Sequence, residues 1–169
     1  AQVVVSVTAL GSLPGRFVPR SGAVPGDAVV VAGRLGWSAA GLRLLQSGVL
    51  EGPLVNAHRR PTPPYALGVV LAAAGATAMC DVSDGLVADL GHVARASGVA
   101  IDLRGDRLAD DAVDLDDVLH GGEDHALVAT LPVGSALPDG CRVVGQVSAG
   151  HPVVLVDGRA TTGGWEHFR

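Results

Sequence analysis

The sequence predicts an α+β fold, in which helices pack on one face of a mixed β-sheet. Apolar residues make up 48% of the 169 residues and charged residues 17%, so the chain can fill a core of ordinary domain size. Up to residue 103, short β-branched segments alternate with segments of helical periodicity, and strand-like segments follow one another after it. Such an order of elements is typical of a sheet with helices laid against it.

The first 25 residues are expected to stand apart from this sheet. Gln2–Leu10 alternates apolar and polar residues and predicts a strand, and a linker containing Gly and Pro follows it. We expect residues 1–25 to be the last strand of a preceding domain with its linker, and residues 26–169 to be the next domain. A strand without partners leaves backbone groups free, so we expect it to pair with another molecule.

Helices and strands are predicted in turn along residues 26–169. Helical spacing of apolar residues predicts helices at Gly36–Ser47, Tyr65–Ala74 and Asp84–Ser97, which we expect to cover the sheet. Asp106–Asp117 contains six Asp in twelve residues and predicts a solvated segment. Strands are predicted at Asp27–Gly33, Thr77–Cys80, Val99–Leu103, His125–Leu131, Arg142–Val147 and Val153–Val156.

Charge and composition exclude several classes of protein. The net charge is −5 and all twelve basic residues are Arg, so no basic surplus is left for a nucleic-acid backbone. The apolar runs are far shorter than the roughly 18 residues of a membrane span, and the first residues lack the basic start of a signal peptide. Cys80 and Cys141 form no metal-binding pattern, and we expect two buried, reduced thiols in a cytoplasmic protein.

An acidic turn, Asp81–Asp84, joins a predicted strand to a predicted helix. Asp81 and Asp84 can bring their carboxylates together, and no basic residue lies nearby in the sequence to neutralise them. A divalent ion such as Mg²⁺ would relieve their repulsion and could bridge phosphate oxygens. Helix capping by Ser83 or Asp84 explains the same residues equally well, so both interpretations stay open.

Other segments offer weaker signals. Gly121–Asp124 can present Glu123 to the N–H groups of a ligand, or form a plain tight turn. The guanidinium of Arg20 could hold phosphate oxygens, and Trp165 with Phe168 could stack on a ring or pin the tail. The Gly-rich junction 33–41 could bind an anion at a helix N-terminus but suits close helix packing just as well. Residues 58–61 form a local basic cluster that a solvated loop explains.

Six segments together carry a family resemblance. They are RSGAVPGD at 20–27, VVVAGRLGWSAAGLRLL at 29–45, HRRPTPPYALG at 58–68, DVSDGLVADLGHVARASG at 81–98, GGEDHALVATLP at 121–132 and GWEHF at 164–168. In this order the chain resembles the C-terminal half of the thiamine-monophosphate kinases, which belong to the AIR-synthase-related family. Three positions depart from the family pattern: Pro64 stands where Arg is usual, and His125 and Ala126 replace Tyr and Glu.

The resemblance implies a fold, a reaction and a set of residue roles. It implies an AIR-synthase-like C-terminal domain at 26–169 and ATP-dependent phosphorylation of thiamine monophosphate to thiamine diphosphate, without a covalent nucleophile. By the same resemblance, Asp81 and Asp84 are Mg²⁺ ligands, Arg20 and Ser83 contact ATP, and Glu123, Trp165 and Phe168 contact the substrate.

The resemblance also implies what must join this chain. An N-terminal half supplies the rest of the active site, the intact enzyme is a homodimer, and this chain alone is inactive. Two alternatives remain from the sequence: a binding or scaffold domain without catalysis, and a related enzyme acting on another small phosphorylated substrate.

Overall fold

A seven-stranded mixed sheet forms the centre of the computed structural model, which describes residues 3–12 and 15–165. Its strands lie in the order β2-β4-β1-β5-β3-β6-β7. All neighbours are antiparallel except β3 and β6, which are parallel. The strands are β1 (Ala28–Ala32), β2 (Ala78–Val82), β3 (Ala100–Leu103), β4 (Ala126–Leu131), β5 (Cys141–Ser148), β6 (Val153–Val156) and β7 (Arg159–Ala160).

Six helices accompany the sheet in the described ranges. They are α1 (Trp37–Gln46), α2 (Pro53–Arg59), α3 (Tyr65–Ala73), α4 (Leu86–Ser97), α5 (Gly105–Leu108) and α6 (Leu115–His120). The predicted mixed sheet and the helices α1, α3 and α4 are therefore confirmed. The short helices α2, α5 and α6 were not predicted.

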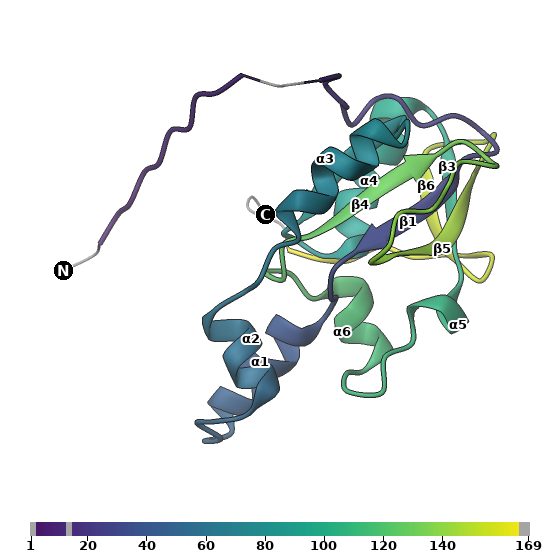
Figure 1. Cartoon of the computed structure of the whole chain (residues 1–169). Helices are drawn as coiled ribbons and strands as arrows, with labels where there is room; N and C mark the ends of the chain where they lie inside the picture. Colours follow the sequence, from purple (N-terminus) through teal and green to yellow (C-terminus); the bar gives the residue numbers. More distant parts are fainter. Residues whose placement is uncertain (1–2, 13–14, 166–169) are drawn as a thin grey trace.

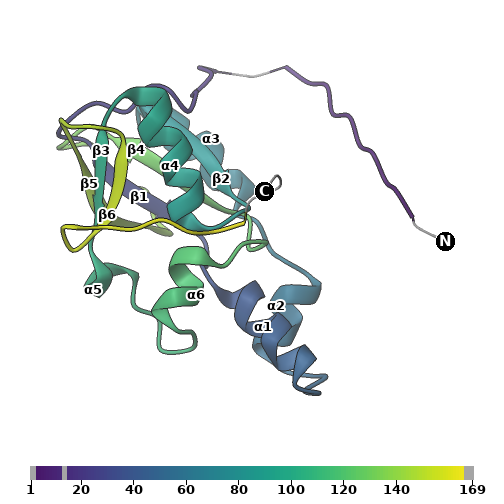
Figure 2. The same ribbon diagram turned by 180° about the vertical axis from the view of Figure 1, so that it is seen from behind.

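Helices cover both faces of the sheet, so the prediction of one covered face is wrong. Alternate residues of β1 enter two separate apolar clusters, because successive side chains of a strand point to opposite faces. Val29 and Val31 pack with residues of α4, whereas Val30 and Ala32 pack with Leu71 of α3. Figures 1 and 2 show α3 and α4 on opposite sides of the strands.

The first helix does not lie on the sheet as expected. Helices α1 and α2 form a hairpin that extends away from the strands (Figure 1). Gly41 of α1 lies so close to the carbonyl of Leu54 in α2 that a Cβ at Gly41 would collide with it. The small residues of α1 therefore allow the two helices to pack closely. Gly36, at the N-terminus of α1, contacts the backbone of α6.

The N-terminal residues form no strand between residues 3 and 12. This segment is exposed and runs away from the sheet in Figure 1, while Gln2 lies outside the described residues. A strand requires a hydrogen-bonded partner, and none of the residues that the structure describes pairs with this segment. From Pro19 the chain returns to the fold, since the carbonyl of Pro19 accepts the N–H of Met79 at 3.1 Å.

The Asp-rich segment contains one buried carboxylate, so its solvated character was predicted only in part. Asp114 and Asp116 are fully solvated, but the side chain of Asp117 is only 7% exposed and pairs with Arg43 of α1. Both cysteines are free thiols; Cys80 is buried as expected, but Cys141 is only partly buried, so that part of the prediction is wrong. Within the described ranges, no helix combines the length and the apolar character that a membrane crossing needs.

Candidate functional site

The acidic turn and the Gly121–Asp124 loop meet because their strands are antiparallel neighbours. The acidic turn begins with the last two residues of β2, the Gly121–Asp124 loop precedes β4, and Val82 lies opposite Ala126 in the register. The backbone N–H of Glu123 donates to the carbonyl oxygen of Ser83 at 3.0 Å. Gly122 approaches the same carbonyl so closely that no Cβ would fit there. Two motifs forty residues apart therefore form one surface.

A buried carboxylate that the sequence analysis did not single out holds the acidic turn. Asp89, in the first turn of α4, is 2% exposed, and its Oδ2 accepts the backbone N–H groups of Ser83 and Asp84 at 3.0 Å each. Burial raises the pKa of Asp89; the two N–H donors act against this, and the carboxylates of Asp84 and Asp81 reinforce it. Its place on the apolar face of the predicted helix was a signal that could have revealed it.

This arrangement bears on the two interpretations of the acidic turn. The N-cap residue of α4 is Gly85, with φ of 116°, so neither Ser83 nor Asp84 occupies the capping position. Asp81 lies in β2 with its side chain 49% exposed. The carboxylate of Asp81 is thus open to solvent at the end of the strand, as a metal ligand requires.

The C-terminal tail completes the same surface. The backbone N–H of Trp165 donates to the carbonyl oxygen of Asp84 at 2.8 Å. Gly164 contacts that carbonyl and Ala88 so closely that a side chain would collide with both. Trp165 as a whole is 67% exposed, and its backbone N–H attaches the tail to the turn. Phe168 lies outside the described residues.

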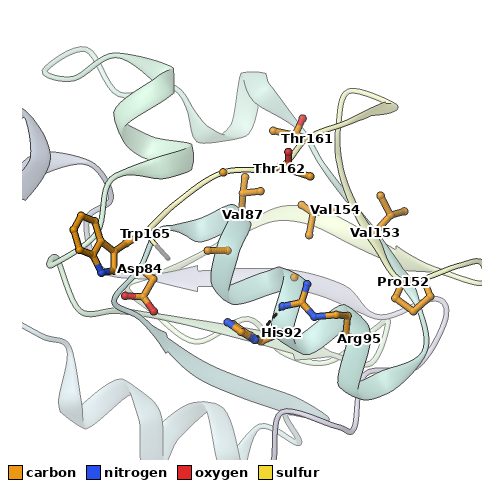
Figure 3. A pocket seen from close by; sticks show the side chains of 13 residues that line it. Asp84, Val87, His92, Arg95, Pro152, Val153, Val154, Thr161, Thr162 and Trp165 are labelled. Carbon is orange, nitrogen blue, oxygen red and sulfur yellow. Dashed lines mark hydrogen bonds between the residues drawn. The ribbon is translucent and has the colours of Figure 1, made fainter. Parts of the chain in front are cut away.

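A cavity of about 570 Å³ lies between α4, β6 and the tail (Figure 3). Asp84 and Trp165 lie at one end, and His92 and Arg95 lie at the other, joined by a hydrogen bond of 3.1 Å. Apolar side chains form much of the wall between them, including Val87 and Val154. This volume is in the range that protein pockets offer to small organic ligands.

His125 lies between the carboxylates of the acidic turn and of Glu123. Its Nδ1 is 4.0 Å from Oδ2 of Asp81, and its Nε2 is 3.8 Å from Oε2 of Glu123. Both Glu123 and His125 have positive φ, 67° and 52°, a backbone conformation that non-glycine residues rarely adopt. The carboxylate of Glu123 is 74% exposed, so the strained loop presents it outward.

Arg20 lies at the free edge of the sheet, beside β2. Its guanidinium is near enough to the Cys80 thiol to act on the pKa of that thiol, which burial raises to about 12 against the lowering effect of Arg20. The structure thus brings Ser83, Asp84, Glu123 and Trp165 together through backbone hydrogen bonds. Asp81 lies at the end of β2 and lines a different pocket from Asp84, and Arg20 lies beside the same strand.

The acidic turn can supply part of a metal site. The described residues contain no group of three or more His, Cys, Asp or Glu side chains arranged to hold a metal ion. Two carboxylates are nevertheless a usual protein contribution to Mg²⁺, which completes its coordination with phosphate oxygens and water. Asp81 and Asp84 therefore suit a metal that arrives with a phosphorylated ligand.

Comparisons with known proteins match nearly all of the chain. Residues 24–157 match the family model described as AIR synthase related protein, C-terminal domain. The chain is 50% identical over 183 residues to a thiamine-monophosphate kinase of Mycobacterium tuberculosis, covering 99% of this chain and 54% of the relative. It is 40% identical over 189 residues to the enzyme of the same name from Corynebacterium glutamicum, covering 98% and 56%.

A solved structure shares the fold. The structure described as AaThiL complexed with AMPPCP and TMP aligns with a TM-score of 0.80 and 37% identity, over 90% of this chain and 55% of that chain. The resemblance inferred from the six segments is thus confirmed. The chain spans about half the length of the relatives it matches.

Proposed function

Because the chain belongs to the AIR synthase related proteins, whose C-terminal domain it matches at residues 24–157, we propose that it is half of an ATP-dependent kinase. The reaction is the phosphorylation of thiamine monophosphate to thiamine diphosphate. The observation that carries the proposal is the meeting of the acidic turn, the Gly121–Asp124 loop and the tail on one surface. Relatives named thiamine-monophosphate kinase and the AMPPCP and TMP of the similar structure support it.

Asp81 and Asp84 are the residues that would hold Mg²⁺. The bound ion would neutralise charge on the phosphate groups of the nucleotide. Asp89 holds the backbone of Ser83 and Asp84 in place, so this part of the turn is formed before a ligand binds. Ser83 lies in the acidic turn and Arg20 lies beside β2, and we assign both to the ATP phosphates. Arg suits this role because its guanidinium binds phosphate oxygens in pairs.

We assign the thiamine monophosphate contacts to Glu123, Trp165 and Phe168. The exposed indole of Trp165 offers a flat face at the mouth of the cavity, and Asp84 lies beside it (Figure 3). A planar, positively charged ring would be attracted by both the indole and the carboxylate. The outward carboxylate of Glu123 can accept N–H groups of the same substrate.

The reaction transfers a phosphoryl group from ATP to the phosphate of the substrate. It depends on the positioning of the reactants rather than on a covalent intermediate with the protein. The residues brought together are carboxylates and hydrogen-bonding backbone groups, which align reactants and organise cations. Since the chain covers about half of its relatives, an N-terminal half would supply the remaining contacts, and this chain alone would not turn over. We assign residues 1–25 to that half and residues 26–169 to the present domain. We propose that the whole enzyme is a homodimer in the cytoplasm.

The test is turnover by the chain joined to such an N-terminal half, with Asp84→Asn as the variant. Asn keeps the shape and removes the charge, so we expect a loss of at least a hundredfold in kcat and a higher Mg²⁺ requirement, or about 3 kcal/mol of barrier. The matched control is Asp139→Asn, which changes an exposed carboxylate outside the surface formed by the acidic turn, the Gly121–Asp124 loop and the tail. Near-normal turnover of Asp84→Asn contradicts the metal role, and absence of thiamine diphosphate formation by wild type contradicts the function.

A further inference from the structure

Positive charge is concentrated in one cavity of an otherwise acidic chain. A pocket of about 800 Å³ at the base of the α1–α2 hairpin is lined by Arg34, Arg59 and Arg60, together with Trp37 and Asp124. We call it the basic pocket. It shares no lining residue with the cavity beside Trp165. None of the three Arg forms an ion pair with a carboxylate of the residues that the structure describes, whereas Arg43, Arg104 and Arg107 do.

Two of the three guanidinium groups are held in place without a ligand. The guanidinium of Arg34 lies 4.2 Å from the centre of the Trp37 ring, and the Trp37 N–H donates to Asp110 at 3.0 Å. Arg59 donates to the carbonyl oxygen of Leu50 at 2.9 Å. Less conformational entropy is therefore lost when these groups bind an anion.

Asp124 places an unusual acceptor in this basic environment. Its Oδ1 accepts the backbone N–H of Ser38 at 2.9 Å, near the start of α1. Its Oδ2 is buried and has no donor of the described residues in hydrogen-bond geometry, although the backbone N–H of Gly36 is near enough to lower the pKa of this carboxyl, which burial raises. A ligand in the pocket therefore reaches Oδ2 only when the Asp124 side chain turns toward it. A buried acceptor without a partner is costly, so a ligand that fills the pocket must bring its own hydrogen-bond donor.

A monoprotonated phosphate group meets both requirements. Its negative oxygens suit the guanidinium groups, and its P–OH supplies the donor that Oδ2 lacks. The pocket is concave and within the usual size of small-molecule sites, and the chain has a net charge of −5. Both points favour a small ligand over a nucleic acid, whose backbone needs an extended basic surface.

We propose that the basic pocket is a second ligand site that binds the phosphate group of a small phosphorylated molecule, with Arg34, Arg59 and Arg60 on its oxygens and Asp124 accepting its P–OH. The Gly-rich junction 33–41, for which anion binding was one interpretation from the sequence, and the basic cluster 58–61 both contribute to its walls. The site goes beyond the proposed kinase centre and does not depend on it.

The test compares inorganic phosphate with sulfate, which carries no proton at neutral pH. Calorimetric titration of the chain with a chelator present excludes binding through a metal at the acidic turn. We expect phosphate to bind at least tenfold more tightly than sulfate, because sulfate leaves Oδ2 without a donor. Arg60→Gln should weaken phosphate binding roughly tenfold or more. Arg107→Gln, an exposed Arg on α5, is the matched control and should change nothing.

Asp124→Asn separates the acceptor from the positive charge. Its amide oxygen can still accept the Ser38 N–H, while its NH₂ can donate to sulfate, so the preference for phosphate should disappear. Asp81→Asn should leave phosphate binding intact even if the kinase proposal fails. Equal binding of phosphate and sulfate by wild type, unchanged binding by Arg60→Gln, or equal loss in Arg107→Gln would overturn the proposal.

One more titration identifies the source of the phosphate group. If thiamine monophosphate displaces inorganic phosphate and Arg60→Gln abolishes that competition, the pocket takes the substrate of the proposed reaction. If phosphate stays bound at saturating thiamine monophosphate, the pocket takes a separate phosphorylated molecule.

Discussion

Replacing Asp89 tests whether one buried carboxylate shapes the acidic turn. Asp89→Ala removes the acceptor of two backbone N–H groups, those of Ser83 and Asp84, both at 3.0 Å. Each N–H left without a partner costs about 1–3 kcal/mol, and relief from burying a charge offsets part of the sum. The expected net loss is about 2–4 kcal/mol in the free energy of unfolding.

Asp89→Asn separates the acceptor from the charge. The amide oxygen can accept the same N–H groups, and the raised pKa of Asp89 indicates that burial disfavours its charged form. We therefore expect a change of at most about 1 kcal/mol for Asn. As a control, Asp102→Ala removes one exposed hydrogen bond, from Gly158, and should cost less than about 1 kcal/mol.

The assay is urea unfolding with thermal melting, combined with Mg²⁺ dependence in the joined enzyme. At about 2–4 °C per kcal/mol, Asp89→Ala should melt about 4–16 °C below wild type. Ala should raise the Mg²⁺ requirement more than Asn does, because only Ala frees the turn. A wild-type melting temperature in Asp89→Ala, or equal losses in Ala and Asn, would refute the positioning role.

Three further predictions follow from exposure and burial. Trp165→Ala should raise KM for thiamine monophosphate severalfold and leave KM for ATP and the melting temperature nearly unchanged, because the residue is 67% exposed; a joint loss would instead indicate a pin for the tail. Iodoacetamide at pH 8 should modify Cys141 before Cys80, whose pKa burial raises to about 12, and early labelling of Cys80 would contradict this. Burial raises the pKa of Asp124, so folding takes up a proton between its ordinary value of 3.8 and the raised value. The free energy of unfolding of the wild type, measured with urea, should therefore fall as pH rises through that interval. Asp124→Asn should make this pH dependence shallower, and an unchanged pH dependence in the variant would contradict the raised pKa.

The sheet was largely predictable because its strands are short β-branched segments with clear ends. The side on which a helix packs was not predictable for α3, whose nine residues are apolar on nearly every side and show no single buried stripe. Helix α2 has seven residues, which is too short for a periodic pattern to stand out. Residues 3–10 alternate like a strand, but a strand is defined by a partner that local sequence does not specify.

The sequence predicted the individual motifs of the candidate site but not how they are arranged in space. The sequence analysis left the acidic turn and Glu123 as separate signals, and the antiparallel pairing of β2 with β4 joins them. Asp89 was missed because only the carboxylates of the turn itself were considered, and its role depends on the hydrogen bonds from the Ser83 and Asp84 N–H groups. The buried Oδ2 of Asp124 depends on contacts between α1 and the Gly121–Asp124 loop, which only the fold brings together.

The most direct measurement is a crystal structure of the chain joined to its N-terminal half, with Mg²⁺, AMPPCP and thiamine monophosphate bound. We expect a metal ion held by carboxylate oxygens of Asp81 and Asp84, beside the nucleotide phosphates. We also expect the substrate ring against Trp165 and its polar groups near Glu123. Phosphates bound away from the acidic turn, with both carboxylates left in solvent, would contradict the account.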